Sequence, residues 1–217
     1  MNLKVYRNVL SANEEWAART RAFLAEKSAV MWNVIGSPGS GKTALLERLV
    51  PLLRDRLPCF VLEGDVETTQ DAERLLALKI PAVQILTHGA CHLGAETVCQ
   101  ALSDLPLEKE GGGGCVFVEN VGNLVCPAEF DVGETGKIAV LSVTEGEDKP
   151  LKYPLLFREA LAAVIAKVDL VPHLPVSLER YRDNIRAVNA EVPVFECSAV
   201  SGTGTDRLAE WLLGRRP

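Results

Sequence analysis

A glycine-rich segment directly after an apolar run constrains this chain more than any other feature. Residues 36–43 read Gly-Ser-Pro-Gly-Ser-Gly-Lys-Thr, between the apolar run Ala29–Ile35 and a stretch with helical spacing, Ala44–Arg56. This is the pattern of a phosphate-binding loop that joins a strand to a helix. Backbone N–H groups of such a loop, with the N-terminus of the next helix, form a concave anion site. The sequence therefore predicts a binding site for a nucleoside triphosphate.

The positions of this loop have different expected roles. Its glycines permit positive φ angles and a close approach of the backbone. Lys42 is predicted to reach the β- and γ-phosphates, where it is the only cation expected, and the Thr43 hydroxyl is predicted to ligate Mg²⁺. The nucleotide-binding residues expected in this segment are Gly36, Ser37, Pro38, Gly39, Ser40, Gly41, Lys42, Thr43 and Ala44.

Composition excludes several classes of protein. With 217 residues and 47% hydrophobic content, the chain can bury the core of one α/β domain. A net charge of −6 argues against a general nucleic-acid binder, which needs a basic stripe. The sequence shows neither a signal-peptide h-region nor an apolar run near the ~18 residues of a membrane span. We therefore expect a cytoplasmic protein whose six cysteines are reduced thiols.

Short apolar runs alternate with stretches of helical spacing along the chain. The candidate strands are Ala29–Ile35, Cys59–Leu62, Ala82–Leu86, Cys115–Val118, Ile138–Val143, Ala162–Ile165 and Val194–Cys197. The candidate helices are Ala44–Arg56, Thr69–Lys79, Ala95–Leu102, Leu151–Glu159, Ser177–Asn189 and Asp206–Leu213. Buried strands that alternate with helices indicate a mostly parallel, doubly wound sheet with helices on both faces.

An additional helix is predicted at the N-terminus. Ser11-Ala-Asn-Glu14 resembles a capping box, and the helix that it opens is expected to end near Glu26. We therefore expect an N-terminal helical extension over residues 1–27 and a single P-loop NTPase domain over residues 28–217.

Acidic residues follow two of the predicted strands. Glu63-Gly64-Asp65 comes after the second strand, and Glu119 begins the segment after the fourth. Ligands of such sheets bind beyond the carboxyl ends of the strands, and phosphoryl transfer depends on positioning and charge stabilisation. We therefore predict that Asp65 holds Mg²⁺ and that Glu119 holds the ion or orients the attacking water. The alternative is that either residue is an ordinary solvated carboxylate.

Two short segments suggest that the base is guanine. Ala166-Lys167-Val168-Asp169 follows the sixth strand and resembles the Asn-Lys-x-Asp segment of GTPases, in which the aspartate accepts hydrogen bonds from guanine. Ser198-Ala199 follows the seventh strand and resembles the Ser-Ala element of the same proteins. Lys167, Asp169, Ser198 and Ala199 are therefore predicted to bind the base. Ala166 departs from the pattern, because it lacks the amide that contacts the base and braces the phosphate loop.

The cysteines fall into two groups. Cys59, Cys99, Cys115 and Cys197 lie in or beside apolar or helical patterns and are predicted to be buried. Cys91, followed by His92, and Cys126 lie in polar loops that contain glycine. Thiolates with an imidazole suit zinc or nickel. The spacing supplies only three ligands, so packed loop thiols remain the alternative.

Several longer segments are similar to one known family. They are Gly36–Thr43, Asp71-Ala-Glu-Arg74, Cys91-His-Leu93, Glu119-Asn-Val-Gly-Asn-Leu-Val-Cys-Pro-Ala128 and Val140-Leu-Ser-Val-Thr-Glu-Gly-Glu-Asp-Lys-Pro-Leu-Lys-Tyr-Pro154. Together they resemble HypB, a GTPase family of the SIMIBI class that inserts nickel during the maturation of [NiFe]-hydrogenase. The similarity extends over residues 11–213.

The resemblance implies more than the residues do by themselves. It implies a homodimer that binds GTP or GDP with Mg²⁺ and, with other hydrogenase accessory proteins, helps to deliver Ni²⁺ to the large-subunit precursor. It also implies that Cys91, His92 and Cys126 form a nickel or zinc site. Some HypB proteins carry an N-terminal Cys or His cluster, but residues 1–30 contain neither residue type. Gly94 likewise stands where many of these proteins have aspartate.

Other functions remain open from the sequence. The alternatives are the related urease accessory GTPase UreG, a metal carrier in which GTP sets the conformation and hydrolysis is incidental, and a P-loop kinase for a small molecule. Asp169 argues against the kinase, because such kinases seldom need a guanine-selective pocket. GTP turnover is expected to be slow, since no arginine finger is identifiable.

Overall fold

The fold is built on one parallel sheet. The computed structural model describes residues 3–67, 69–107 and 113–215, with side chains from residue 11 onward. Its strands are β1 (Ala29–Gly36), β2 (Cys59–Asp65), β3 (Ala82–Leu86), β4 (Gly114–Glu119), β5 (Gly136–Ser142), β6 (Ala160–Ala166) and β7 (Val194–Cys197). They pair in the order β3-β2-β4-β1-β5-β6-β7, and each pair is parallel. The predicted parallel sheet is confirmed, with strand ends that differ from the expected ones by up to three residues.

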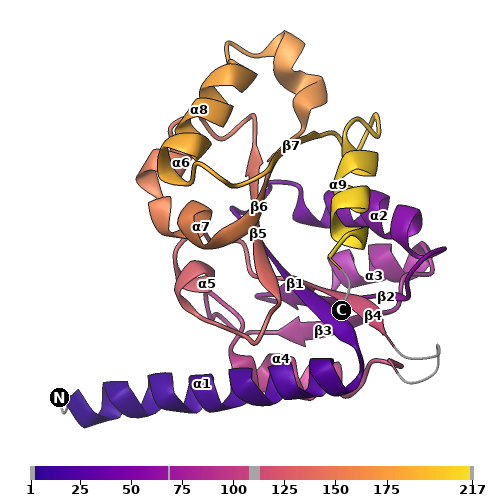
Figure 1. The fold of residues 1–217 in the computed structure, drawn as a ribbon, viewed down its shortest axis with the longest axis vertical. Helices are drawn as coiled ribbons and strands as arrows, with labels where there is room; N and C mark the ends of the chain where they lie inside the picture. Colours follow the sequence, from indigo (N-terminus) through magenta and orange to yellow (C-terminus); the bar gives the residue numbers. More distant parts are fainter. Residues whose placement is uncertain (1–2, 68, 108–112, 216–217) are drawn as a thin grey trace.

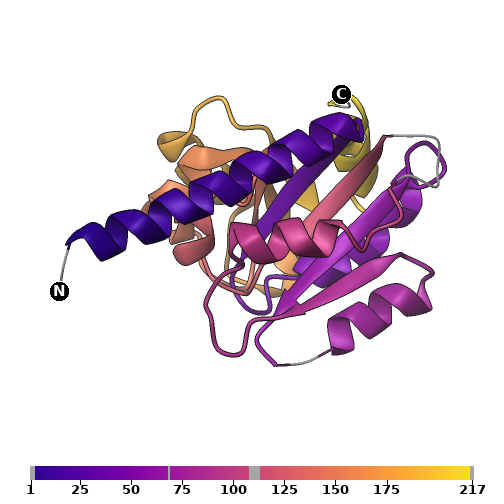
Figure 2. The ribbon, with the colours of Figure 1, turned by 90° about the horizontal axis from the view of Figure 1, so that it is seen from below.

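Helices cover both faces of the sheet (Figures 1 and 2). They are α1 (Leu3–Glu26), α2 (Lys42–Leu53), α3 (Gln70–Ala77), α4 (Ala95–Leu102), α5 (Cys126–Glu129), α6 (Lys149–Lys152), α7 (Pro154–Glu159), α8 (Leu178–Val188), α9 (Thr205–Leu213) and a 3₁₀ helix, η1 (Val168–His173). Helices α2, α3 and α9 pack on one face, whereas α1, α4, α7 and α8 pack on the other. Among the described residues, no helix is both long and apolar enough to cross a membrane.

The central strand β1 explains why helices are needed on both sides. Every residue of β1 is buried, and successive side chains point to opposite faces of the sheet. Val30, Trp32 and Val34 join the core under α2 and α9, whereas Met31 joins the core under α1 and α4. This arrangement holds the loop after β1 at the carboxyl edge of the sheet, between two packed layers.

Two expectations about helices were wrong. Helix α1 begins at Leu3, so Ser11 lies inside it and is not its N-cap, although the helix ends at Glu26 as predicted. One face of α1 is buried at Ala17, Thr20 and Leu24, and the helix packs along α4 (Figure 2). The expected helix Leu151–Glu159 is two short helices, because Pro154 lacks an N–H group and restricts Tyr153 before it. The division of the chain at residue 27 stays a prediction.

Candidate functional site

The loop between β1 and α2 has the backbone of a phosphate-binding loop. Gly39 and Gly41 have φ angles of +73° and +96°, which strain other residues. A β-carbon at Gly36 would lie 2.5 Å from the carbonyl oxygen of Val140, so no larger residue fits there. The Lys42 Nζ lies 3.4 Å from the carbonyl oxygens of Gly36 and Ser37, so the side chain folds over the loop.

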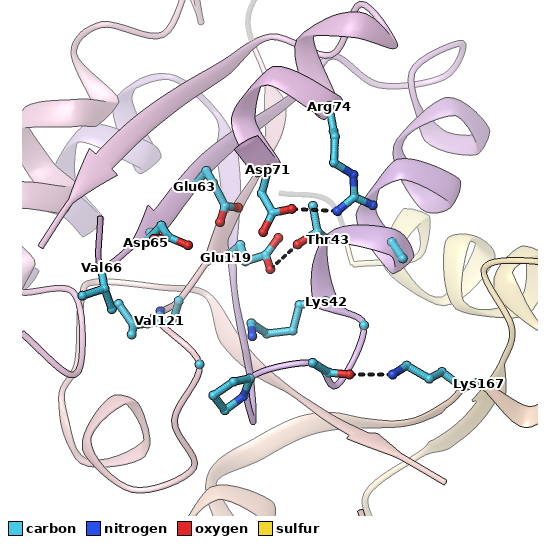
Figure 3. Close-up of a pocket in the computed structure, with 17 residues that line it drawn as sticks. Lys42, Thr43, Glu63, Asp65, Val66, Asp71, Arg74, Glu119, Val121 and Lys167 are labelled. Carbon is cyan, nitrogen blue, oxygen red and sulfur yellow. Dashed lines mark hydrogen bonds and ion pairs between the residues drawn. The ribbon is translucent and has the colours of Figure 1, made fainter. Parts of the chain in front are cut away.

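A cavity of about 510 Å³ opens above this loop, beyond the carboxyl ends of β1, β2 and β4 (Figure 3). It is lined by Pro38, Gly39, Gly41, Lys42, Thr43, Ala44, Glu63, Gly64, Asp65, Val66, Asp71, Arg74, Glu119, Asn120, Val121, Gly122 and Lys167. The predicted residues Lys42, Thr43, Asp65 and Glu119 thus share one cavity. Ser40 is fully buried and, like Gly36, supports the loop from behind.

Four carboxyl groups converge on the cavity: Glu63, Asp65, Asp71 and Glu119 (Figure 3). The Thr43 hydroxyl donates a 2.8 Å hydrogen bond to Glu119 Oε1. Asp65 lies at the end of β2, and its Oδ1 accepts a hydrogen bond from the backbone N–H of Glu67. These are hard oxygen ligands of the kind that Mg²⁺ prefers.

Glu63 and Glu119 form a buried carboxyl pair because they are register partners on β2 and β4. Burial, together with the neighbouring Glu119, raises the pKa of Glu63 to about 10, so this group is protonated at neutral pH. Burial also raises the pKa of Glu119, although Lys42 opposes this shift. One oxygen of each group is buried without a hydrogen-bond donor among the described residues. Such oxygens suit a shared proton or a bound cation.

Glu63 and Arg74 also line the cavity, although the sequence patterns did not predict them there. Glu63 lies inside β2 because this strand runs three residues further than expected, and Glu63 and Asp65 share one face of it. Arg74 lines the cavity and pairs with Asp71 at 2.7 Å and with Glu47 at 2.8 Å. Lys42 is therefore not the only cation at this cavity. The Glu-x-Asp spacing was a signal for Glu63, whereas Arg74 depends on how α3 packs beside α2.

A second cavity, of about 230 Å³, adjoins the first on the side of β6 and β7. It is lined by Gly41, Ala44, Leu45, Ala166, Lys167, Asp169, Leu170, Cys197, Ala199 and Val200. The predicted base-binding residues Lys167, Asp169 and Ala199 therefore lie together. Ser198 lies behind them, where its Oγ accepts a hydrogen bond from Ser201 and holds the turn. This narrow cavity with one carboxylate suits a planar base.

Lys167 braces the phosphate loop, a role that the GTPase pattern gives to the asparagine replaced here by Ala166. It has a φ angle of +62°, unusual for a residue with a side chain, and its Nζ donates a 2.6 Å hydrogen bond to the Gly39 carbonyl (Figure 3). The end of β6 is thereby tied to the phosphate loop without an asparagine at position 166. The phosphate loop is therefore braced although position 166 carries no side-chain amide.

Cys91, His92 and Cys126 come together although the last is distant in sequence. One ligand atom from each lies within 4.8 Å of the other two, and Cys91 Sγ is 3.6 Å from His92 Nδ1. Ligand atoms that share a zinc ion at 2.0–2.3 Å lie within about 4 Å of one another, so a small adjustment would close the set around a metal. Burial lowers the pKa of His92, which favours the neutral, ligating imidazole.

The remaining cysteines agree with the prediction, with one exception. Cys59, Cys115 and Cys197 are buried, but Cys99 is only half-buried because it lies at the edge of the face that α4 packs against the sheet. All six cysteines are free thiols.

Phe130 and Asn13, which the sequence patterns did not indicate, contact His92 or the segments that carry the three candidate metal ligands. The Phe130 ring stacks on the His92 imidazole with centroids 4.0 Å apart. Asn13, on α1, accepts a hydrogen bond from the Ala95 N–H and donates one to the Asp131 carbonyl. The N-terminal helix thus joins the two segments that carry the ligands. No local pattern in the sequence indicates these contacts.

Comparisons with known proteins show the family of this chain. The family model "CobW/HypB/UreG, nucleotide-binding domain" matches residues 30–196. The chain is 47% identical over 214 residues to a hydrogenase maturation factor HypB of Escherichia coli strain K12. The aligned region covers 99% of this chain and 73% of that protein.

Two solved structures have the same fold. The crystal structure of hydrogenase maturation factor HypB from Archaeoglobus fulgidus is 33% identical with a TM-score of 0.86, covering 94% of this chain and 98% of that one. The structure of HypB from Helicobacter pylori in complex with nickel is 35% identical with a TM-score of 0.87, covering 94% of each chain. The phosphate loop, the Cys-His-Cys cluster and these similarities show that the chain belongs to the HypB hydrogenase maturation factors, within the CobW/HypB/UreG family of P-loop GTPases.

Proposed function

We propose that this protein hydrolyses GTP slowly, in the presence of Mg²⁺, and uses its nucleotide state to control a nickel ion delivered to the [NiFe]-hydrogenase large-subunit precursor. The supporting observation is that one polypeptide segment, residues 119–131, begins at the phosphate cavity and contains Cys126 of the metal cluster. A nucleotide site and a soft metal site joined in this way suit a switch better than two separate activities.

The residues around the first cavity suit phosphoryl transfer. The N–H groups at the start of α2 and the Lys42 ammonium would bind the phosphates. Thr43 and Asp65 would hold Mg²⁺, which neutralises charge on the phosphate oxygens. The Thr43 oxygen can face the ion while its proton stays bonded to Glu119. Glu119 would orient the attacking water. Besides Lys42, the cations among the described lining residues are Arg74 and Lys167. Arg74 is held by Asp71 and Glu47, and Lys167 by the Gly39 carbonyl, which agrees with slow turnover.

The ligand set of Cys91, His92 and Cys126 suits a metal ion that is bound transiently and then delivered. Three ligands leave a coordination position open, which a delivery site needs but a structural zinc site does not have. A homodimer that brings two clusters together across a two-fold axis would close this position between transfers. Nickel is the proposed cargo because a HypB structure is described in complex with nickel, and Zn²⁺ is the competing ion for the same donors.

The whole proposal is tested on the unmodified protein. We expect release of inorganic phosphate from GTP that requires Mg²⁺, and binding of about one Ni²⁺ per chain. The nickel affinity and the dimer fraction, measured by chelator competition and sedimentation, should differ between GDP and a non-hydrolysable GTP analogue. Phosphate transferred to an added small acceptor would instead indicate a kinase. Nickel binding that ignores the nucleotide would indicate a simple carrier.

The base-binding cavity makes a separate prediction. Asp169→Ala should weaken GDP and GTP binding on the order of 100-fold, because two hydrogen bonds to a charged acceptor are lost. ADP binding should stay weak and unchanged. Asp104→Ala, which removes an exposed carboxylate far from the cavity, is the control. Fluorescent GDP and ADP analogues give both affinities, and equal affinity of the parent for the two would contradict the guanine assignment. Ala166→Asn should raise guanine affinity only modestly, because Lys167 already braces the loop.

A further inference from the structure

The segment between the two sites is in direct contact with the phosphate loop. The Asn123 N–H donates a 3.1 Å hydrogen bond to the Gly36 carbonyl, at the start of that loop. Next to it, a β-carbon at Gly122 would lie 2.8 Å from the Cα of Pro38, so the two backbones pack without any side chain between them. A shift of the phosphate loop therefore moves residues 122 and 123, since close-packed backbone cannot absorb it locally.

The Asn123 side chain contacts both segments that carry the metal ligands. Its Nδ2 donates a 3.2 Å hydrogen bond to the carbonyl oxygen of Cys91. Its Oδ1 accepts a 2.9 Å hydrogen bond from the N–H of Val125, the residue before Cys126. One side chain thus joins the phosphate loop to Cys91 and to the turn that positions Cys126.

A neighbouring asparagine holds the same metal-binding loop from a fixed point. Asn120 is buried, and its Oδ1 accepts hydrogen bonds from the N–H groups of Leu93 and Val121. Its Nδ2 donates to Asn33, inside the central strand β1. Because Leu93 is anchored in this way, a displacement of Asn123 changes the position of Cys91 relative to His92 and Leu93.

We propose that Asn123 is a positioning residue that transmits the nucleotide state to the metal site by moving the Cys91 carbonyl and the Val125–Cys126 turn together. The inference rests on the function proposed above and specifies how its two sites communicate. Asn123 binds neither ligand. Asn123 affects the ratio of the metal affinities in the two nucleotide states. The reason is that it connects the phosphate loop to the metal-binding segments, and the distance between them depends on the bound nucleotide.

Substitutions at Asn123 separate this role from a simple structural one. Asn123→Asp keeps the acceptor for the Val125 N–H but replaces the donor to Cys91 by an oxygen that repels the carbonyl. Asn123→Ala removes both bonds. Asn189→Asp is the matched control, because the Asn189 Nδ2 also donates to a backbone carbonyl, that of Phe157, but bonds neither to the phosphate loop nor to the segments that carry the metal ligands. Thermal melting identifies any variant that fails to fold.

The measured quantity is the Ni²⁺ dissociation constant with saturating GDP divided by that with a saturating GTP analogue and Mg²⁺. In the parent and in Asn189→Asp this ratio should differ from one by roughly 5–150-fold, the usual range of coupling between sites. In Asn123→Asp and Asn123→Ala the ratio should fall at least fivefold toward one. By reciprocity, the effect of Ni²⁺ on nucleotide affinity should fall by the same factor.

Each other outcome overturns a different statement. If both Asn123 variants keep the parental ratio, or lose nickel affinity equally in the two nucleotide states, Asn123 only supports the fold of the site. If the parent binds nickel and nucleotide but its two Ni²⁺ dissociation constants are equal, the two sites are not coupled and Asn123 transmits nothing. The assignments of the two binding sites would then still hold. If the parent binds neither ligand, the proposed function fails together with this inference.

Discussion

Replacing Lys42 by alanine is expected to lower GTP turnover on the order of 10²–10³-fold. The Lys42 side chain is mostly buried and already folded over the phosphate loop, so its ammonium meets the phosphates without a cost of ordering. Arg74 is held by Asp71 and Glu47 and cannot take its place without breaking two ion pairs. Phosphate release under saturating Mg²⁺ and GTP binding with a fluorescent analogue measure the two losses.

The matched control is Lys27→Ala. Lys27 precedes β1, whereas the phosphate loop follows it, so the lysine lies at the opposite edge of the sheet, where it pairs with Glu26 and lies over the Phe23 ring. Its loss removes the same charge as Lys42→Ala but no contact with the phosphate loop. Normal turnover in Lys42→Ala would contradict the assignment of the phosphate site. Equal losses in both variants would show that the effect is one of long-range charge.

Replacing Cys91 or Cys126 by alanine is expected to weaken Ni²⁺ binding at least 100-fold, more than the 10–100-fold typical when only a supporting contact of a metal ligand is lost. Each thiol supplies one of the three ligand atoms that lie within 4.8 Å of one another. Two remaining donors cannot hold the ion against water or buffer. Chelator competition under reducing conditions measures the affinity. Sedimentation in each nucleotide state tests whether the proposed metal-dependent dimer is lost together with nickel binding.

Cys99→Ala provides the control for the thiol itself. Cys99 is also a free and partly accessible thiol, but it lies on α4 and belongs to no cluster of metal-binding side chains among the described residues. It should bind nickel like the parent. Parental nickel affinity and nucleotide dependence in both Cys91→Ala and Cys126→Ala would show that these residues are packed loop thiols.

Local patterns were sufficient to predict the framework of this protein. The alternation of apolar runs and helical spacing predicted every strand of the described sheet, because burial on both faces leaves a mark in each strand separately. The glycine positions of the phosphate loop were predictable for the same reason, since the need for a positive φ angle is a property of a single residue.

Local patterns were misleading at two places in the helices. Ser11 has the residue type and spacing of a cap, but α1 already begins at Leu3, so the capping pattern lies inside the helix. The region around Tyr153 has helical spacing on both sides, and only the backbone restriction of Pro154 divides it.

The sequence by itself determined the phosphate loop and the parallel sheet, and its resemblance to HypB pointed to Cys91, His92 and Cys126 as the candidate metal ligands. The tertiary structure alone decided that Glu63 pairs with Glu119, that Arg74 reaches the cavity, and that Asn123 joins the phosphate loop to Cys91. The first set depends on properties of consecutive residues. The second depends on strand register and on contacts between segments far apart in the chain, and these are set only when the two layers of helices pack on the sheet.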